Sequence, residues 1–153
     1  MDRRGFSLVE TVAAVAVLAI LAGCVCFAAV GLKANPQREA EELANWLTER
    51  ITRAQTEGSS FSLECTRRTG GQGLSLSLVW LDGRARGKKE SYANEKVNMF
   101  DMAGIRTRTF DGTWQTLTPA LTICVEQSAG SRERVYVRVS GEGQVNVSDN
   151  WRD

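Results

Sequence analysis

The acid at position 10 is the residue whose type and place suggest chemistry most directly. Glu10 stands immediately before residues 11–32, a segment without one charged side chain. A carboxylate at the edge of a segment of membrane length is costly unless a partner neutralises it. The chemistry that Glu10 suggests is therefore ion pairing with a cation rather than acid or base catalysis.

Other features of catalytic or metal sites are absent from the sequence. The 153 residues include no histidine, no glycine-rich phosphate loop follows a predicted strand, and the serine and aspartate residues show no catalytic spacing. Outside residues 11–32, no two cysteines are close enough in sequence for a zinc motif. We therefore expect no catalytic residue, no metal site and no cofactor, and a chain that is not an enzyme.

The four cysteines allow one disulfide to be considered. Cys24 and Cys26 are two residues apart in the apolar segment, so on a helix they would face different directions and could not readily bridge. Cys65 and Cys124 fall in separate predicted strands, and a bridge between them would close a long loop and stabilise the fold. The alternative is that both are buried free thiols.

The segment that positions Glu10 is long enough to span a bilayer. As a helix, residues 11–32 would measure roughly 33 Å, against a hydrocarbon core of about 30 Å. Arg3 and Arg4 precede it, and cationic flanks stay on the cytoplasmic side. The sequence thus predicts a single membrane span with a cytoplasmic N-terminus and with the rest of the chain on the opposite side.

Three simpler readings of this segment remain open. A cleaved secretory signal would have a shorter apolar region, and an ordinary signal anchor would leave Glu10 unexplained. Residues 21–24 (Leu-Ala-Gly-Cys) match the site at which bacterial lipoproteins are cleaved and lipidated on cysteine, here Cys24. Against this third reading, the residues after Cys24 are apolar, where a polar tether is usual.

A fourth reading accounts for more residues. Residues 5–10 read Gly-Phe-Ser-Leu-Val-Glu, and this hexapeptide resembles the cleavage site of type IV prepilins. The resemblance implies that a prepilin peptidase cuts between Gly5 and Phe6 and methylates the new amine of Phe6. It also implies a leader at 1–5 and a hydrophobic transmembrane and filament-core helix at 6–32. In a filament, Glu10 would pair with the Phe6 amine of a neighbouring subunit and so determine assembly.

Residues 33–57 are predicted to be an amphipathic continuation of this stem helix. Asn35 suits an N-cap and Pro36 the first helical turn, while Gly58 suits the end of the helix. Apolar residues recur at three- and four-residue steps, at Ala40, Leu43, Ala44, Leu47, Ile51 and Ala54. Such a stripe normally packs on a sheet.

Residues 58–153 have the composition of a β-rich head. Strands are predicted from alternating apolar residues, at 61–65, 74–80, 97–102, 105–110, 121–125, 134–140 and 144–148. Residues 70–73 and 83–96 are predicted to be loops. We therefore expect an α+β protein of type IV pilin-like fold, in which the long N-terminal helix packs on an antiparallel β-sheet head.

This order of elements resembles the minor pseudopilins and minor pilins, the group that includes GspH and FimT. The resemblance implies a structural subunit of a pilus-like filament, with type II protein secretion as the first choice and DNA uptake, adhesion or twitching as the alternative. It implies other pilin subunits, the prepilin peptidase and an inner-membrane assembly platform as partners. The chain would be held in the bacterial inner membrane with its head in the periplasm.

The net charge does not favour nucleic acid as a partner. The chain has 19 basic and 18 acidic residues, and loss of the leader would balance them. One basic cluster departs from this balance, at Arg84, Arg86, Lys88 and Lys89. Its Gly-Arg-x-Arg start is similar to a motif of FimT-type minor pilins that bind DNA, although that motif belongs to their C-terminal region. DNA contact at these residues is therefore a minor alternative.

Overall fold

The computed structural model describes residues 12–21, 34–67 and 73–150. The chain divides into two compact units, Met1–Ala34 and Asn35–Asp153. In the first unit, residues 12–21 are helical and their side chains are exposed. Among the residues that the structure describes, no helix is both long and apolar enough to cross a membrane. Most of the predicted 6–32 helix, together with Gly5, Phe6, Glu10 and Cys24, lies outside the described residues.

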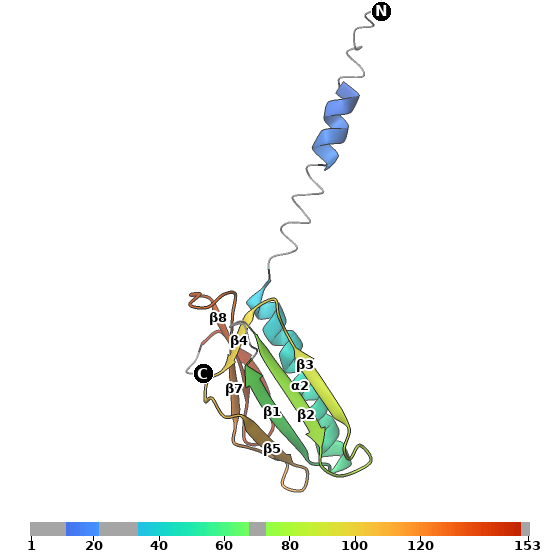
Figure 1. Ribbon diagram of the computed structural model, residues 1–153, viewed down its shortest axis with the longest axis vertical. Coiled ribbons are helices and arrows are strands. Elements are labelled where there is room, and N and C mark those ends of the chain that lie inside the picture. The colour runs from blue at the N-terminus through green and yellow to red at the C-terminus, as the bar shows by residue number, and fades with distance from the viewer. Residues whose placement is uncertain (1–11, 22–33, 68–72, 151–153) are drawn as a thin grey trace, which may run out of the picture. The chain divides into compact units, whose positions relative to one another are not determined.

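The second unit begins with helix α2 (Pro36–Glu57), whose two ends are capped as predicted (Figure 1). The Oδ1 atom of Asn35 accepts a hydrogen bond from the backbone N–H of Gln37 at 3.0 Å, and Pro36 occupies the first turn. Gly58 ends the helix in the left-handed conformation, with φ of 61°, which glycine adopts without steric cost. The six apolar residues of the predicted stripe are all buried.

Nine strands follow α2 and form two antiparallel sheets. The five-stranded sheet has the order β3-β2-β1-β5-β6, and the four-stranded sheet has the order β4-β7-β8-β9. The bounds of the strands are β1 Phe61–Arg67, β2 Leu74–Trp80, β3 Lys89–Ala93, β4 Asn98–Asp101, β5 Thr107–Asp111, β6 Thr116–Thr118, β7 Leu121–Glu126, β8 Arg134–Val139 and β9 Val145–Ser148.

The strand predictions were right for seven elements, but β3 and β6 were missed. β3 lies within residues 83–96, which were predicted to be a loop, so that part of the prediction is wrong. It is an edge strand without a fully buried residue, so it lacks the apolar alternation that marks a strand in sequence. β6 is three residues long and pairs only with β5 in the sheet.

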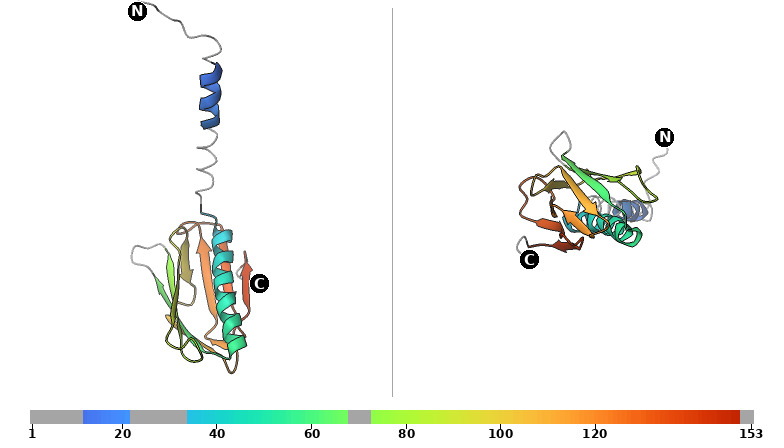
Figure 2. Two further views of the ribbon diagram at one scale, coloured as in Figure 1. Left: turned by 90° about the vertical axis from the view of Figure 1, so that its right-hand side faces the viewer. Right: turned by 90° about the horizontal axis from the view of Figure 1, so that it is seen from below.

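The core of the head lies between the two sheets and α2, as the end-on view of Figure 2 shows. On the five-stranded sheet, Phe61 stacks on Phe110 with ring centroids 5.1 Å apart, and its edge meets Trp80 at 5.6 Å. These rings come from the neighbouring strands β1, β5 and β2, which places a large apolar cluster near the C-terminal end of α2.

Candidate functional site

The helix at residues 12–21 presents large apolar side chains to its surroundings. Val12, Val15, Leu18 and Ile20 are each at least 60% exposed. A helix that is apolar on all sides needs lipid or other helices around it. The described part of the first unit is therefore suited to helix–helix or helix–lipid packing, and it directly follows the predicted cleavage and assembly residues.

In the second unit, one carboxylate joins α2 to the edge of the five-stranded sheet. Glu90 on β3 accepts hydrogen bonds from Arg50 Nε at 3.1 Å and from the indole Nε1 of Trp80 at 3.2 Å. Lys88 Nζ lies 3.2 Å from the same carboxylate. Burial alone would raise the pKa of Glu90, but the bonds from Trp80 and Lys88 and the nearby cations hold the pKa below its ordinary value.

Stacking of arginines on aromatic rings occurs in the same region, where α2 meets the edge of the five-stranded sheet. The guanidinium of Arg50 lies 4.8 Å from the ring centroid of Trp46, and that of Arg53 lies 4.9 Å from the ring of Trp80. These contacts combine ring packing with cation–π attraction. The Arg53–Trp80 contact joins the C-terminal half of α2 to β2, whereas the Arg50–Trp46 contact lies within α2 itself.

A second carboxylate ties the first turn of α2 to the connection between β3 and β4. Glu39 is 4% exposed and accepts hydrogen bonds from the side-chain amide of Asn94 and from Lys96 Nζ, the latter at 3.3 Å. The Oδ1 atom of Asn94 in turn accepts the backbone N–H of Lys96 at 2.9 Å. Both halves of α2 are thus bonded to the head.

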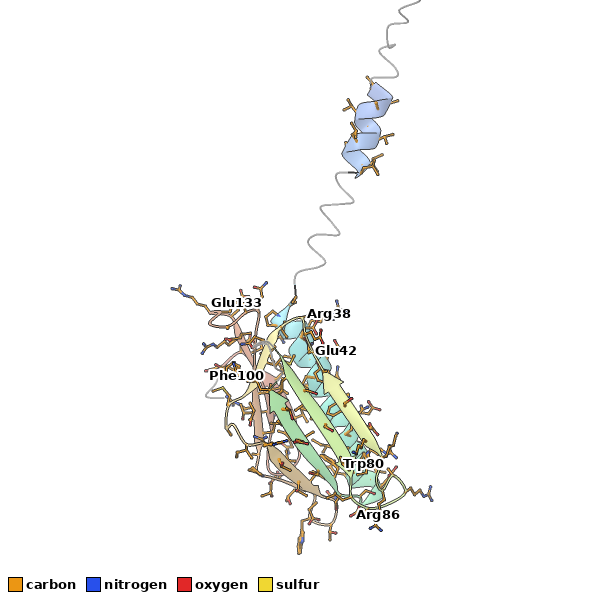
Figure 3. All side chains as sticks on the ribbon, in the orientation of Figure 1. Arg38, Glu42, Trp80, Arg86, Phe100 and Glu133 are labelled. Atoms are coloured by element: carbon orange, nitrogen blue, oxygen red, sulfur yellow. The ribbon has the colours of Figure 1, made fainter. Side chains whose placement is uncertain are left out.

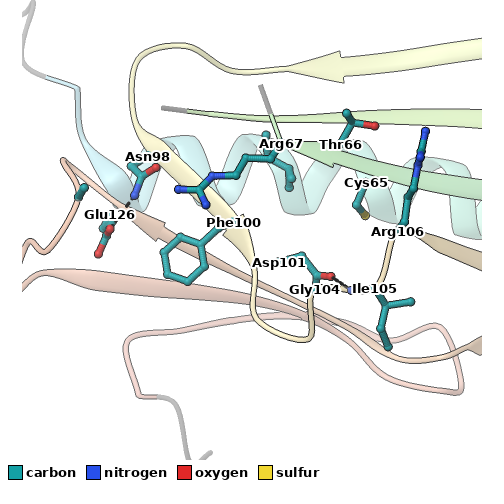
Figure 4. Close-up of a pocket in the computed structure, with 12 residues that line it drawn as sticks. Cys65, Thr66, Arg67, Asn98, Phe100, Asp101, Gly104, Ile105, Arg106 and Glu126 are labelled. Carbon is teal, nitrogen blue, oxygen red and sulfur yellow. Dashed lines mark hydrogen bonds between the residues drawn. The ribbon is translucent and has the colours of Figure 1, made fainter. Parts of the chain in front are cut away.

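A groove lies where β1 ends. It has a volume of about 720 Å³, and the close-up in Figure 4 shows residues from both sheets around it. Leu74, Phe100 and Ile105 supply apolar lining, and Arg67 and Arg106 are exposed cations on its border. A groove of this size and lining can receive one large side chain or a small molecule.

The groove wall is held by the most deeply buried arginine of the head. The side chain of Arg108 is 0% exposed, and its Nη2 atom lies 2.8 Å from Oδ1 of Asp101. Its Nη1 atom donates to the carbonyl oxygen of Ile105 at 2.6 Å, and its Nε donates to that of Ala120 at 3.2 Å. Arg108 therefore fixes the turn between β4 and β5, which forms one side of the groove.

The predicted Cys65–Cys124 disulfide is not formed in the structure, where both residues are buried free cysteines. Cys65 Sγ instead lies 3.4 Å from the donating Nη1 of Arg108, and Cys124 belongs to β7 of the other sheet. Burial raises the pKa of each thiol to about 11. The structure therefore has the alternative that the sequence left open, in which both cysteines are buried free thiols.

Glu126 organises the opposite side of the groove. It is 3% exposed and accepts hydrogen bonds from the side-chain amide of Asn98 at 2.6 Å and from the backbone N–H of Gly130 at 3.2 Å. Arg134 Nε lies 3.3 Å from its other oxygen. The buried carboxylate is therefore satisfied, and the ends of β4, β7 and β8 are joined beside the groove.

The basic cluster considered for DNA contact lies at the other end of β2. Arg84, Arg86, Lys88 and Lys89 are all exposed, on the turn before β3 and at the start of that strand; Figure 3 labels Arg86 near the C-terminal end of α2. Lys88 is paired with Glu90. The cluster is a solvent-facing turn without aromatic stacking of its own, so the DNA alternative stays a prediction.

Sequence reasoning gave no warning of Arg108, Asp101 or Glu126. The residues next to each of them in the sequence do not mark it as buried. The residues that bond to it lie on other strands. Within the described ranges, no cluster of three or more metal-ligating side chains occurs. The described part of the head presents a groove and exposed turns.

Comparisons with known proteins show one family motif and one fold to which this chain is similar. Residues 1–23 match the model of the prokaryotic N-terminal methylation motif. The structure is similar to two crystal structures of the type IV minor pilin FimU of Pseudomonas aeruginosa, with TM-scores of 0.53 and 0.54 and 18% and 19% identity. Each match covers 73% of this chain, and 87% and 91% of FimU. Comparison with curated proteins finds no match.

The chain thus carries the prokaryotic N-terminal methylation motif and has the fold of a type IV pilin. The α+β prediction of a helix packed on an antiparallel head is confirmed, with the refinement that the head contains two sheets. The resemblance drawn from residues 5–10 is confirmed as well, because those residues lie within the matched motif.

Proposed function

We propose that this chain is a minor pilin or minor pseudopilin, a structural subunit that assembles into a pilus-like filament. The observation that carries the proposal is the methylation motif at residues 1–23 on a chain whose second unit is a helix with both halves bonded to a β-sheet head. An exposed apolar helix at residues 12–21 supports it further, because filament cores are built from packed apolar helices.

We further propose roles for three residues outside the described ranges. Prepilin peptidase would cut between Gly5 and Phe6 and methylate the Phe6 amine. Glu10 would neutralise the Phe6 amine of an adjoining subunit during assembly, since a charge among packed apolar helices needs a partner. Before assembly the subunit would reside in the inner membrane, with its N-terminus cytoplasmic and its head periplasmic, in contact with the assembly platform.

Processing can be measured directly in cells that make prepilin peptidase. Mass spectrometry of the wild-type chain is expected to show an N-terminal methyl-Phe6, whereas the Gly5→Leu variant is expected to retain residues 1–5 uncleaved. Glu10→Ala should be processed normally but lost from the sheared filament fraction. An intact Met1 terminus in the wild type, or acylation at Cys24, would contradict the proposal and favour a signal anchor or a lipoprotein.

For the machine that the filament serves, we propose type II secretion, with a type IV pilus as the second candidate. The second candidate is supported by the fold similarity to FimU, which is a type IV minor pilin. Deletion of the gene in its native host separates the two. Loss of exoprotein secretion with normal twitching and DNA uptake supports the first, and the opposite pattern supports the second.

A further inference from the structure

The groove at the end of β1 is bordered by two strand edges. β1 pairs with β5 only over residues 61–64, so its last residues, Thr66 and Arg67, extend past β5 while they stay paired with β2. β4 pairs with β7 on one side and with no strand of the described head on the other. Thr66 and Arg67 line one wall of the groove, and Asn98 and Phe100 of β4 line the other (Figure 4). The two sheets therefore part at this place.

The register of β4 shows which backbone groups its free edge carries. The backbone N–H of Met102, directly after β4, donates to the carbonyl oxygen of Thr122 at 2.9 Å. Residues of an antiparallel strand direct their backbone groups alternately to the two sides. The N–H groups of Met99 and Asp101 and the carbonyl oxygen of Met99 are therefore directed away from β7. These groups can pair with one further strand.

The other edge strands of the described head are protected from such pairing. β3 begins at Lys89 and is bonded to α2 through Glu90. β6 has three residues and is followed by Pro119, and β9 packs beside α2. Charged residues, proline, short length and covering elements are the usual means by which proteins prevent the addition of a strand. β4 is also short, but residues 98–101 include neither lysine nor proline.

The charges of the groove favour an acidic occupant. Three of the four charged residues that line it have ion-pair partners, in the pairs Asp101–Arg108, Glu126–Arg134 and Arg106–Glu64. The fourth, Arg67, is exposed and has no ion-pair partner within the described ranges. Figure 4 shows its side chain extending over the groove toward Asn98 and Phe100. A carboxylate in the groove would neutralise this arginine.

We propose that the groove binds an extended segment of another protein, which adds as a strand to the free edge of β4. The segment has an acidic side chain that pairs with Arg67 and an apolar side chain that contacts Phe100 and Ile105. Main-chain hydrogen bonds supply affinity in this mode of binding, and the side chains supply specificity. One copy of this chain forms the whole site, so the proposal goes beyond the filament role and does not require neighbouring copies.

The test measures binding of a defined peptide to the full-length chain in detergent micelles. The probe is a fluorescein-labelled peptide of sequence Ser-Thr-Val-Val-Asp-Asp-Thr-Ser, which carries one valine and one aspartate on each face when extended. Fluorescence anisotropy is expected to show saturable binding. Hydrogen exchange measured by mass spectrometry is expected to slow at residues 98–102 when the probe is bound, and to stay unchanged in α2.

Two matched peptides test the two parts of the recognition. In one, both aspartates are replaced by lysine, which removes the pair with Arg67. In the other, two adjacent central amides are N-methylated, so that a main-chain donor is blocked on each edge of the peptide. Each is expected to bind at least about tenfold more weakly than the probe, which corresponds to about 1.4 kcal/mol.

Variants of the chain locate the site. Arg67→Glu and Ile105→Glu change exposed side chains, so both chains should fold, as checked by protease resistance. Each is expected to weaken binding of the probe at least about tenfold. Arg84→Glu, on the exposed turn between β2 and β3, is the matched control and should leave the affinity unchanged.

Several results would overturn the proposal. They are no saturable binding of the probe, equal binding of the lysine or the N-methylated peptide, and equal binding by Arg67→Glu. Association of wild-type chains with one another in the same micelles, if Arg67→Glu abolished it, would assign the groove to a second copy and would also overturn the proposal. The cleavage and shearing assays above do not use the probe, so the filament role is judged independently.

Discussion

Arg108 and Asp101 form a two-pronged ion pair inside the head: Nη2 of the arginine lies 2.8 Å from Oδ1 and 2.9 Å from Oδ2 of the aspartate. The two side chains are 0% and 7% exposed. The remaining guanidinium hydrogens are directed at the carbonyl oxygens of Ile105 and Ala120 and at Cys65 Sγ. The pair therefore joins β5 to the β4–β5 turn and to the start of β7, and it supports the groove wall.

Removal of one partner of this pair should be severe. Arg108→Ala leaves the buried carboxylate of Asp101 without its cation, and we expect a loss of about 3–5 kcal/mol in the free energy of unfolding. Urea unfolding of the detergent-solubilised chain, followed by tryptophan fluorescence, measures it. Arg106→Ala breaks an exposed pair with Glu64 and should cost less than about 1 kcal/mol. Equal losses in the two variants would contradict the role assigned to Arg108.

The helix ends were predictable from sequence because their causes are local. Asn35 and Gly58 act on backbone groups within four residues, so residue type and spacing are sufficient. The apolar stripe of α2 was predictable for the same reason. The two short or polar edge strands were not, since β3 takes its place from β2 and from α2 contacts at Glu90 and Tyr92.

The buried charges could not be predicted from the sequence either. Arg108 sits between two threonines and has the appearance of a solvent-facing strand residue, yet its cross-strand partner is the core residue Leu63. Its burial follows from that register and from Asp101, which a turn brings beside it. Register across strands is a tertiary property, so the groove and its supports could not be derived from local patterns.

Gly112 is predicted to tolerate no larger side chain. A Cβ at this position would lie 2.5 Å from the carbonyl carbon of Gly58 and 2.6 Å from the backbone of Ser59. Because backbone atoms cannot move aside cheaply, Gly112→Ala should lower the free energy of unfolding by about 1–3 kcal/mol. Gly141→Ala is the matched control, since a Cβ there meets nothing within 4 Å, and it should change stability by less than about 0.5 kcal/mol. Similar melting temperatures for both variants would contradict this packing.

The thiols of Cys65 and Cys124 are predicted to be free but slow to react. With pKa values of about 11, roughly one thiol in a thousand would be ionised at pH 8. Iodoacetamide should therefore label both cysteines slowly in the native chain and quickly in urea without reductant. Peptide mass spectrometry distinguishes the sites. Labelling in urea that appears only after a reductant is added would instead show that the two are bridged.

Glu90 should make the stability of the head depend on pH. Its pKa is lowered in the folded chain from the ordinary 4.5, so the stabilisation is fully present above pH 4.5 and is lost as the pH falls through the lower, folded-state pKa. Glu90→Gln should therefore be less stable than the wild type at pH 7, and the difference should shrink as the carboxylate of the wild type becomes protonated. Urea unfolding at a series of pH values measures the difference. Glu42→Gln, on the exposed side of α2, should show a small difference at every pH. A gap for Glu90→Gln that stays constant down to pH values well below 4.5 would mean that the carboxylate charge does not hold β3 against α2, and that packing of Trp80 and Tyr92 alone fixes this edge.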